Sequence, residues 1–327
     1  MDERLRVTEM RIANYIRKTG VLAGYTILCA NVLILAGSAR AGEAPRCSGG
    51  LQLRLSVPLT SQGSVLTAEV RSGKVIKEIT GTWMERDIYF WKAGLAAGQR
   101  RGADVEQALV GVDLEKTPGT YKLTVAATFE NGERAVCGVP VAVRAGKFKT
   151  ERLTVENKFV EPNEQQAARA VAEQQKLRQL FDHVDAKKLW QGDFQFPLKG
   201  VTQGTNFGKR RILNGQARSP HTGADFPAAS GTPVYSTQSG HVALAEELYF
   251  SGNTVIIDHG LGVYSLYGHL SEFAVTAGDD VKVGAVIGKV GATGRVTGPH
   301  LHWGVTVNKA RVNPVQLVTV SRGRRKQ

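Results

Sequence analysis

The chain has 327 residues, of which 42% are hydrophobic and 22% charged, and it contains 37 glycines. This composition excludes an intrinsically disordered chain, favours a turn-rich and mainly β protein, and allows two domains of ordinary size. The formal net charge of +13 favours anionic surroundings, such as nucleic acid, a membrane surface or an acidic wall polymer, without choosing among them.

The N-terminal segment has the pattern of an export signal. Residues 1–20 carry five basic side chains, residues 21–37 carry no charge, and Ala39-Arg40-Ala41 supplies small residues before a cleavage point. We expect residues 1–41 to be a signal peptide that is cleaved after Ala41. An uncleaved membrane anchor is the alternative, for which the apolar run is at the short end of the usual length. Either way, the sequence predicts an exported protein of the periplasm or cell envelope.

Cleavage after Ala41 changes both the charge and the cysteine content. It removes six basic and three acidic residues from a chain of charge +13, which leaves +10. It also removes Cys29 and leaves Cys47 and Cys137. An even pair in an oxidising compartment predicts a disulfide, with two unpaired buried thiols as the alternative. Neither cysteine has a neighbour at metal-ligand spacing, so a cysteine-bound zinc site is not expected.

Residues 42–148 consist of short segments in which apolar and polar residues alternate. This period of two predicts β-strands over residues 51–57, 65–70, 87–91, 108–114, 121–129 and 135–143. Asn131-Gly132 lies between the last two segments and indicates a hairpin. Residues 118–125 resemble the late strands of bacterial immunoglobulin-like domains. We therefore expect an immunoglobulin-like β-sandwich, in which the disulfide ties the first strand to the last.

Residues 149–192 are predicted to be a linker with one amphipathic helix. Pro162 suits a first helical position, and apolar residues recur at three- and four-residue spacing, namely Ala167, Ala170, Val171, Leu177, Leu180, Phe181 and Val184. Residues 193–318 return to a strand-and-turn pattern, with strands expected over 254–258 and 263–267 in a barrel-like antiparallel sheet. Residues 319–327 are expected to be a basic, solvated tail.

Four of the seven histidines lie in patterns that carry chemistry. In His300-Leu301-His302 the two imidazoles are two residues apart, so a strand would direct both toward one face. In His221-Thr-Gly-Ala-Asp225, a histidine and a carboxylate converge if the chain turns tightly, which Gly223 permits. Two histidines and one aspartate make the three protein ligands of a catalytic zinc, whose fourth position holds water.

A succession of motifs in residues 207–314 resembles the lysostaphin-type (LytM-type) zinc metallopeptidases, which are peptidoglycan endopeptidases. The motifs are Phe207-Gly-Lys-Arg-Arg211, His221-Thr-Gly-Ala-Asp225, Gly231-Thr-Pro-Val234, Gly252-Asn-Thr-Val-Ile-Ile-Asp-His-Gly260, Tyr267-Gly-His-Leu-Ser271 and Gly294-Arg-Val-Thr-Gly-Pro-His-Leu-His302. By this resemblance His221, Asp225 and His302 match the ligands of one Zn²⁺, and His269 and His300 match the two catalytic histidines. The resemblance also implies a substrate among the peptides of peptidoglycan, cut at D-alanyl or glycyl bonds.

Other candidate residues are expected to be structural or remain undecided. His183, His241 and His259 are expected to have packing, surface or turn-holding roles, and Trp303 to belong to the core or the groove wall. Arg210 and Arg211 either line the groove and meet substrate carboxylates or are only solvated.

A catalytically inactive relative that binds cell wall or activates an amidase is the main functional alternative. Such a relative is expected to lack ligands or catalytic histidines, whereas all five positions are filled here. Anionic envelope polymers and a regulatory envelope protein are conceivable partners. A nucleic-acid partner is not expected, because the basic residues are scattered and no recognition motif is present.

Overall fold

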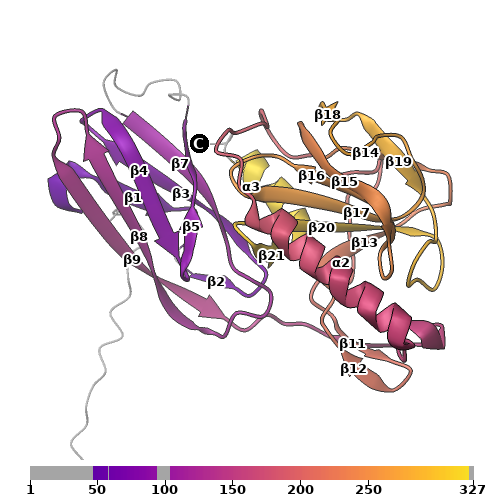
Figure 1. Cartoon of the computed structure of the whole chain (residues 1–327). Helices are drawn as coiled ribbons and strands as arrows, with labels where there is room; N and C mark the ends of the chain where they lie inside the picture. Colours follow the sequence, from indigo (N-terminus) through magenta and orange to yellow (C-terminus); the bar gives the residue numbers. More distant parts are fainter. Residues whose placement is uncertain (1–46, 58, 94–103, 324–327) are drawn as a thin grey trace, which may run out of the picture. The chain divides into compact units, whose positions relative to one another are not determined.

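The computed structural model describes residues 47–57, 59–93 and 104–323, all within one compact unit, Ala44–Gln327. Its described part is mainly β, as predicted, with two α-helices, α2 and α3 (Figure 1). The predicted signal segment, residues 1–41, lies outside the described residues and stays a prediction. Within the described ranges, no helix has the length and hydropathy needed to cross a membrane.

The N-terminal domain contains two sheets. Its strands are β1 (Gln52–Leu55), β2 (Leu59–Ser61), β3 (Val65–Ser72), β4 (Ile76–Trp83), β5 (Arg86–Ile88), β6 (Phe90–Lys92), β7 (Asp104–Gly111), β8 (Gly119–Phe129) and β9 (Arg134–Arg144), preceded by a short 3₁₀ turn, η1 (Ser48–Gly50). One sheet has the order β1-β3-β7-β6 and the other β2-β9-β8-β4-β5. Leu53 and Val70 of the first sheet and Val125 and Val141 of the second are fully buried in one core. Two sheets that share a core are compatible with the predicted β-sandwich, whose immunoglobulin-like topology stays a prediction.

The predicted disulfide is present. It joins Cys47, just before η1, to Cys137 in β9, with 4.8 Å between the two Cα atoms. Because the bond closes a segment of 90 residues, it removes much of the conformational freedom of the unfolded domain.

Strand prediction in this domain was right for the hairpin and incomplete for its neighbour. Strands β8 and β9 pair in antiparallel fashion across the Asn131-Gly132 turn, where Gly132 has a φ of 82°. Strand β4, which pairs with β8, was not predicted. Its register with β8 shifts between Ile76 and Glu78, and such a bulge disrupts the alternation from which strands are recognised.

The linker contains β10 (Thr150–Leu153), a 3₁₀ turn η2 (Asn157–Phe159) and helix α2 (Glu164–Asp182). The helix starts two residues after Pro162, which the sequence suggested as its first residue. Asn163 precedes the first helical residue, and its side chain accepts a hydrogen bond from the Gln166 backbone N–H while the Gln166 side chain accepts one from the Asn163 N–H. This reciprocal cap satisfies two N–H groups that a helix end otherwise leaves unpaired.

Helix α2 rests on the C-terminal domain. Leu177, Leu180 and Phe181 pack against a cluster formed by Leu244, Leu248, Ile256 and Tyr264 of the C-terminal sheet. Val171, which the periodicity placed on the apolar face, is 65% exposed. The packed stripe is therefore confined to the second half of the helix.

The C-terminal domain is built on a nine-stranded sheet. Its elements, with the separate hairpin β11–β12, are β11 (Arg210–Leu213), β12 (Gln216–Arg218), β13 (Gly223–Pro227), β14 (Pro233–Tyr235), β15 (Gly240–Leu248), β16 (Gly252–Asp258), β17 (Val263–Phe273), β18 (Asp280–Val281), β19 (Val286–Val290), β20 (His300–Val307), β21 (Ala310–Val312) and α3 (Pro314–Gly323). The main order is β13-β20-β17-β16-β15-β18, with β14, β19 and β21 paired off this path. Helix α3 includes residues 319–323, which the sequence assigned to a basic tail, because Leu317 and Val318 anchor it in the core.

Polar contacts join the two domains. The Arg311 guanidinium donates to both carboxylate oxygens of Asp113, through Nε at 3.0 Å and Nη2 at 2.6 Å. The Gln316 side chain accepts from the Val65 N–H, and Val65 shares the core of the C-terminal domain. The N-terminal domain is thereby held against β21 and α3 of the C-terminal domain.

Candidate metal and catalytic site

The register of three neighbouring strands brings the chemically interesting residues together. In the β13–β20 pair Asp225 lies opposite His302, and in the β17–β20 pair Gly268 lies opposite the same histidine. His269 follows directly after Gly268 on β17. Along β20, His300 and His302 share one face while Leu301 is fully buried on the other. Residues distant in the sequence thus meet on one face of β13, β20 and β17.

Three of the predicted site residues converge on one point. His221 Nε2 lies 2.8 Å from His302 Nδ1, and each of these atoms lies 3.1 Å from Asp225 Oδ1. Among the described residues, this trio forms a group with the spacing needed to hold a metal ion. All three belong to the predicted ligand set.

Gly223 contributes to this convergence in a different way from the one expected. It lies in strand β13 rather than in a tight turn. A Cβ atom at this position would come within 2.7 Å of the His302 ring. Glycine is therefore needed for the close approach of His302 to His221 and Asp225.

The donor set and its spacing fit a zinc ion. Tetrahedral bonds of about 2.0–2.1 Å place ligand atoms about 3.3 Å apart, close to the 2.8–3.1 Å separations of the trio. Burial lowers the pKa of His221 to about 4, so its imidazole is neutral at pH 7, the state that binds a metal. Burial acts to raise the pKa of Asp225, but hydrogen bonds from His221 and His302 outweigh it and hold that pKa below its usual range.

His269 and His300 have one ring nitrogen each engaged by a carbonyl. Nδ1 of His269 lies 2.8 Å from the Thr293 oxygen, and Nδ1 of His300 lies 2.8 Å from the Gly298 oxygen. A carbonyl only accepts, so both Nδ1 atoms carry a proton, and Nε2 is the nitrogen that accepts a proton in the neutral form of each ring. His300 Nε2 lies 3.6 Å from Asp225 Oδ1, and the rings of His269 and His300 are 4.9 Å apart between centroids. Two proton-accepting imidazoles therefore flank the trio.

His269 is held in an unusual conformation. Its φ of 63° lies in the left-handed region, which is costly for a residue with a side chain. Its backbone N–H donates to the Ser251 oxygen at 2.7 Å, which helps to keep this conformation. Burial, followed by the neighbouring His302 and His300, lowers the pKa of His269 to about 3. The imidazole is accordingly neutral over the whole physiological pH range.

The remaining predicted candidates lie away from this point. His259 is fully buried and bonded to the Ser239 carbonyl and the Ser265 hydroxyl, and Trp303 is fully buried in the core. His241 is largely exposed beside Asp280, and His183 ends helix α2.

A cleft of about 280 Å³ opens beside the trio. Asp225, His269 and His300 form part of its wall. Arg211 also lines it, with Nη2 3.7 Å from Asp225 Oδ2, whereas Arg210 is exposed.

Sequence reasoning missed part of the cleft wall. Arg295 was quoted within a motif but given no role, although its position five residues before His300 could have indicated one. Glu151, Leu153 and Val155 come from the linker and reach the cleft because β10 pairs in parallel with β11. No local sequence pattern reports such a pairing.

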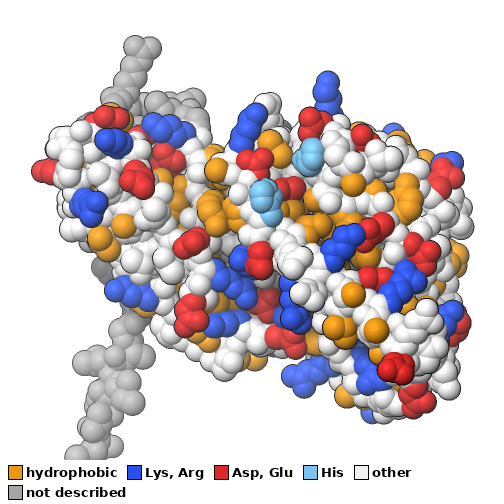
Figure 2. Space-filling view, in the orientation of Figure 1, with side chains coloured by type: hydrophobic (Ala, Val, Ile, Leu, Met, Phe, Trp, Pro, Cys, Tyr) orange, Lys and Arg blue, Asp and Glu red, His pale blue; other side chains and the backbone are white. Residues whose placement is uncertain are grey.

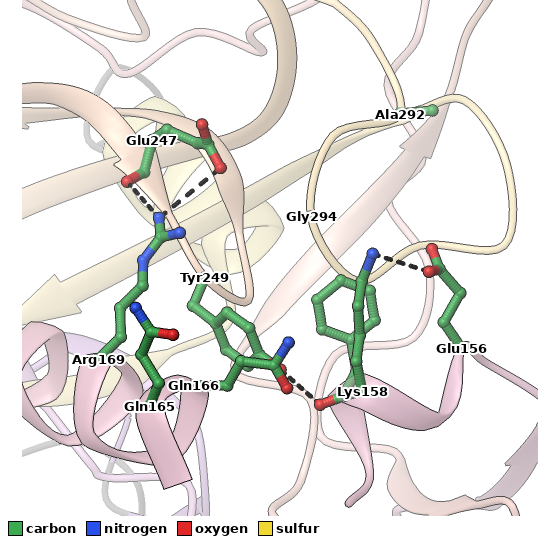
Figure 3. Close-up of a pocket in the computed structure, with 10 residues that line it drawn as sticks. Glu156, Lys158, Gln165, Gln166, Arg169, Glu247, Tyr249, Ala292 and Gly294 are labelled. Carbon is green, nitrogen blue, oxygen red and sulfur yellow. Dashed lines mark hydrogen bonds and ion pairs between the residues drawn. The ribbon is translucent and has the colours of Figure 1, made fainter. Parts of the chain in front are cut away.

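A second cavity, of about 570 Å³, is lined partly by the loop before β20, which also carries Arg295. Figure 3 shows Ala292 and Gly294 of this loop facing residues of η2 and α2. Lys158 pairs with Glu156 and Arg169 with Glu247, and the Tyr249 hydroxyl donates to the Lys158 carbonyl (Figure 3). Its charged side chains are thus satisfied by one another, and the contacts attach the linker to the C-terminal domain.

The surface charge is dispersed on the face that Figure 2 shows. Basic and acidic side chains alternate there and do not gather into a single basic patch. This face therefore lacks the concentrated positive stripe by which proteins track nucleic acid.

Comparison with known proteins identifies the C-terminal domain. Residues 219–314 match Peptidase family M23. The DD-carboxypeptidase/endopeptidase Mpg of Neisseria meningitidis is 46% identical over 97 residues, which are 30% of this chain and 22% of that protein. The peptidoglycan DD-endopeptidase ShyA of Vibrio cholerae is 42% identical over 113 residues, which are 34% of this chain and 26% of that protein. The chain thus spans about a quarter of the length of these relatives, and the shared region is the part that matches Peptidase family M23.

A solved structure also matches beyond the C-terminal domain. A crystal structure described as a putative peptidase M23 from Pseudomonas aeruginosa superposes with a TM-score of 0.55 at 26% sequence identity. The match covers 80% of this chain and 95% of that one. The resemblance in fold therefore extends beyond the peptidase domain.

Proposed function

We propose that this M23-type domain makes the chain an exported zinc-dependent endopeptidase that hydrolyses cross-links or stem peptides of bacterial peptidoglycan. The observation that carries the proposal is the convergence of His221 Nε2, Asp225 Oδ1 and His302 Nδ1 beside an open cleft. Three protein ligands with space for a fourth group are the pattern of a catalytic zinc rather than a structural one. The relatives from Neisseria and Vibrio, named DD-carboxypeptidase/endopeptidase and peptidoglycan DD-endopeptidase, suggest the substrate class.

The residues divide the work of hydrolysis between them. When bound, the zinc ion would lower the pKa of a water molecule and polarise the scissile carbonyl. His221, Asp225 and His302 would hold the ion, and the Asn206 amide positions Asp225 by a hydrogen bond of 3.3 Å. Nε2 of His269 and of His300 is available to accept the proton of the attacking water. The histidine that accepts this proton can return it to the leaving amine, which completes the hydrolysis.

The proposed location rests on the N-terminal segment and on the disulfide. Residues 1–41 have the charge and hydropathy pattern of a signal peptide. The Cys47–Cys137 bond suits an oxidising compartment. A mature chain of charge +10, reached from +13 by cleavage, would be attracted to anionic envelope polymers. We therefore place the enzyme in the periplasm or cell envelope.

The test is digestion of purified peptidoglycan by the chain from Gly42 onward, followed by identification of the released muropeptides. New fragments cut within the peptides, and their loss on chelation and return with zinc, are expected. Cleavage that survives complete chelation would overturn the metal mechanism. A chain that binds zinc stoichiometrically but releases no fragment would instead favour an inactive, wall-binding role.

A further inference from the structure

Thr293, in the loop before β20, holds His269 through both its main chain and its side chain. The Thr293 carbonyl accepts the His269 Nδ1–H at 2.8 Å. The Thr293 hydroxyl donates to the Leu270 oxygen at 2.9 Å and accepts from the Asn253 backbone N–H at 2.9 Å. Leu270 follows His269 on β17, and Asn253 lies at the start of β16. One side chain therefore ties the loop to both strands at the position next to His269.

Close packing places this loop directly against the start of β16. A Cβ atom at Gly252 would come within 2.3 Å of the Thr293 hydroxyl oxygen and 2.5 Å of its carbonyl oxygen. A Cβ atom at Gly294 would lie 2.4 Å from the Gly252 nitrogen. Both glycines have a positive φ, 61° at Gly252 and 75° at Gly294, which residues with a side chain rarely adopt. Loop and strand are thus in direct backbone contact, and the hydroxyl bonds of Thr293 determine where its carbonyl lies.

His269 depends on these neighbours for the state of its imidazole. Its φ of 63° is costly, and its backbone N–H is held by the oxygen of Ser251, which directly precedes Gly252. The bond from Nδ1 to the Thr293 carbonyl sets the tautomer, because a nitrogen that faces a carbonyl must carry the proton. With the proton on Nε2 instead, that atom could not accept a proton from water. Both the orientation and the tautomer of the ring therefore depend on the Thr293 carbonyl.

We propose that Thr293 is a positioning residue for proton transfer, and that its hydroxyl group acts through His269. The hydroxyl holds the loop, the loop places the carbonyl, and the carbonyl keeps the imidazole oriented with Nε2 unprotonated. This inference rests on the proposed function, in which His269 is one of the two histidines that accept a proton. It requires no contact of Thr293 with the substrate or with the metal-binding trio.

The kinetic test compares two substitutions of Thr293 on a soluble cross-linked tetrapeptide dimer. Thr293→Val removes the hydroxyl at similar volume and is expected to lower kcat by about 10- to 100-fold, as is typical when a group that orients an active-site histidine is lost. KM should stay unchanged, because no contact with the substrate is removed. Thr293→Ser retains the hydroxyl and should keep kcat near the wild-type value.

Thr237→Val is the matched control for the loss of a buried hydroxyl. Thr237 is fully buried, its hydroxyl donates to the Gln195 carbonyl, and it is not among the residues that line the cleft. This substitution also leaves a carbonyl without its donor, so it should lower Tm. We expect kcat to stay at the wild-type level, because His269 keeps its support.

A double variant shows whether Thr293 acts through His269. Residues that work as a unit have non-additive effects, so Thr293→Val should leave the residual kcat of His269→Ala unchanged. An equal fold-loss of kcat in the wild-type and His269→Ala backgrounds would mean that Thr293 only stabilises the domain, which overturns the inference.

The tautomer of His269 is a readout that needs no catalysis. Nitrogen NMR of the chain with isotope-labelled histidine, compared with His269→Ala to identify the signal, should place the proton on Nδ1 in the wild-type chain and in Thr293→Ser. Thr293→Val should show both tautomers. A wild-type proton on Nε2, or a single unchanged tautomer in Thr293→Val, contradicts the inference. If Thr293→Val does not fold by circular dichroism, Thr293→Ala takes its place as the variant without a hydroxyl.

Failure of the proposed function has a different signature. In that case zinc-loaded wild-type chain cuts neither the dimer nor peptidoglycan, while the tautomer measurement still decides whether Thr293 sets the state of His269. Conversely, a wild-type chain that cuts the dimer, with Thr293→Val equally active, leaves the proposed function intact and removes only the positioning role.

Discussion

Replacement of His302 by alanine is the sharpest perturbation of the metal site. His302 Nδ1 lies 2.8 Å from His221 Nε2 and 3.1 Å from Asp225 Oδ1, so its loss opens one corner of the trio. The alanine side chain supplies no donor, and no other described histidine nitrogen occupies that corner. We therefore expect His302→Ala to lose zinc under conditions in which the wild-type chain retains it.

The magnitude follows from the number of ligands. A structural zinc site with four ligands has a binding free energy of about 10–16 kcal/mol, which corresponds to about 3–4 kcal/mol for each ligand. Loss of one ligand then weakens zinc binding by about 10²- to 10³-fold. At a zinc concentration of about 1,000 Kd, the wild-type chain gains about 4 kcal/mol of stability by mass action, and the variant about 1 kcal/mol. With about 2 °C per kcal/mol for a chain of this size, zinc raises Tm by about 8 °C and about 2 °C, respectively.

Differential scanning calorimetry with and without zinc, combined with equilibrium dialysis, measures both quantities. His241→Ala is the matched control, because it also removes a histidine, but one that is 48% exposed beside Asp280. The control is expected to keep the full zinc-dependent rise in Tm. If His302→Ala binds one zinc per chain as tightly as the wild-type chain, the proposed ligand set is wrong.

Three further predictions concern proton transfer, pH and the domain junction. Variants with alanine at His269 or His300 should retain most of the zinc yet have a kcat lowered by about 10²- to 10⁴-fold, because each histidine supplies a proton-accepting Nε2. Metal analysis measures the zinc and muropeptide assays measure kcat. Wild-type turnover in both variants would contradict the prediction. His259 has its pKa lowered by burial from 6.5 to about 4, so the unfolded chain binds the extra proton between these values and stability falls as pH falls. Between pH 7 and pH 5 the protonation of this histidine lowers the free energy of unfolding by about 2 kcal/mol. In urea titrations of the metal-free protein, the His259→Gln variant should therefore lose less stability over that interval than the wild-type chain. If the free energy of unfolding of both falls equally with pH, His259 does not contribute. Arg311→Ala leaves the Asp113 carboxylate without its bidentate partner, although Asp113 is only 9% exposed. The substitution should therefore lower the free energy of unfolding by about 3–5 kcal/mol. A loss below about 1 kcal/mol would mean that water replaces the guanidinium.

Much of the site was predictable because its residues follow local rules. The alternation of His300, Leu301 and His302 predicts two imidazoles on one strand face, and the structure has Leu301 buried opposite them. The imidazole of His221 and the carboxylate of Asp225, together with one imidazole of that pair, also indicate a three-ligand metal site. These inferences need only the period of a strand and the chemistry of the side chains.

What the sequence by itself determined is the mainly β character, the disulfide partners, the amphipathic linker helix and which residues are candidates to bind metal or accept protons. Only the tertiary structure decided that β13, β20 and β17 are neighbours, that Gly223 makes room for the His302 ring, and that the linker forms part of the cleft wall. The place of Arg295 in the cleft wall, over the Phe250 ring, likewise depends on how distant segments pack together. The physical reason is that side-chain type and spacing are encoded locally, whereas strand register, close approach and charge balance arise from contacts between residues far apart in the chain.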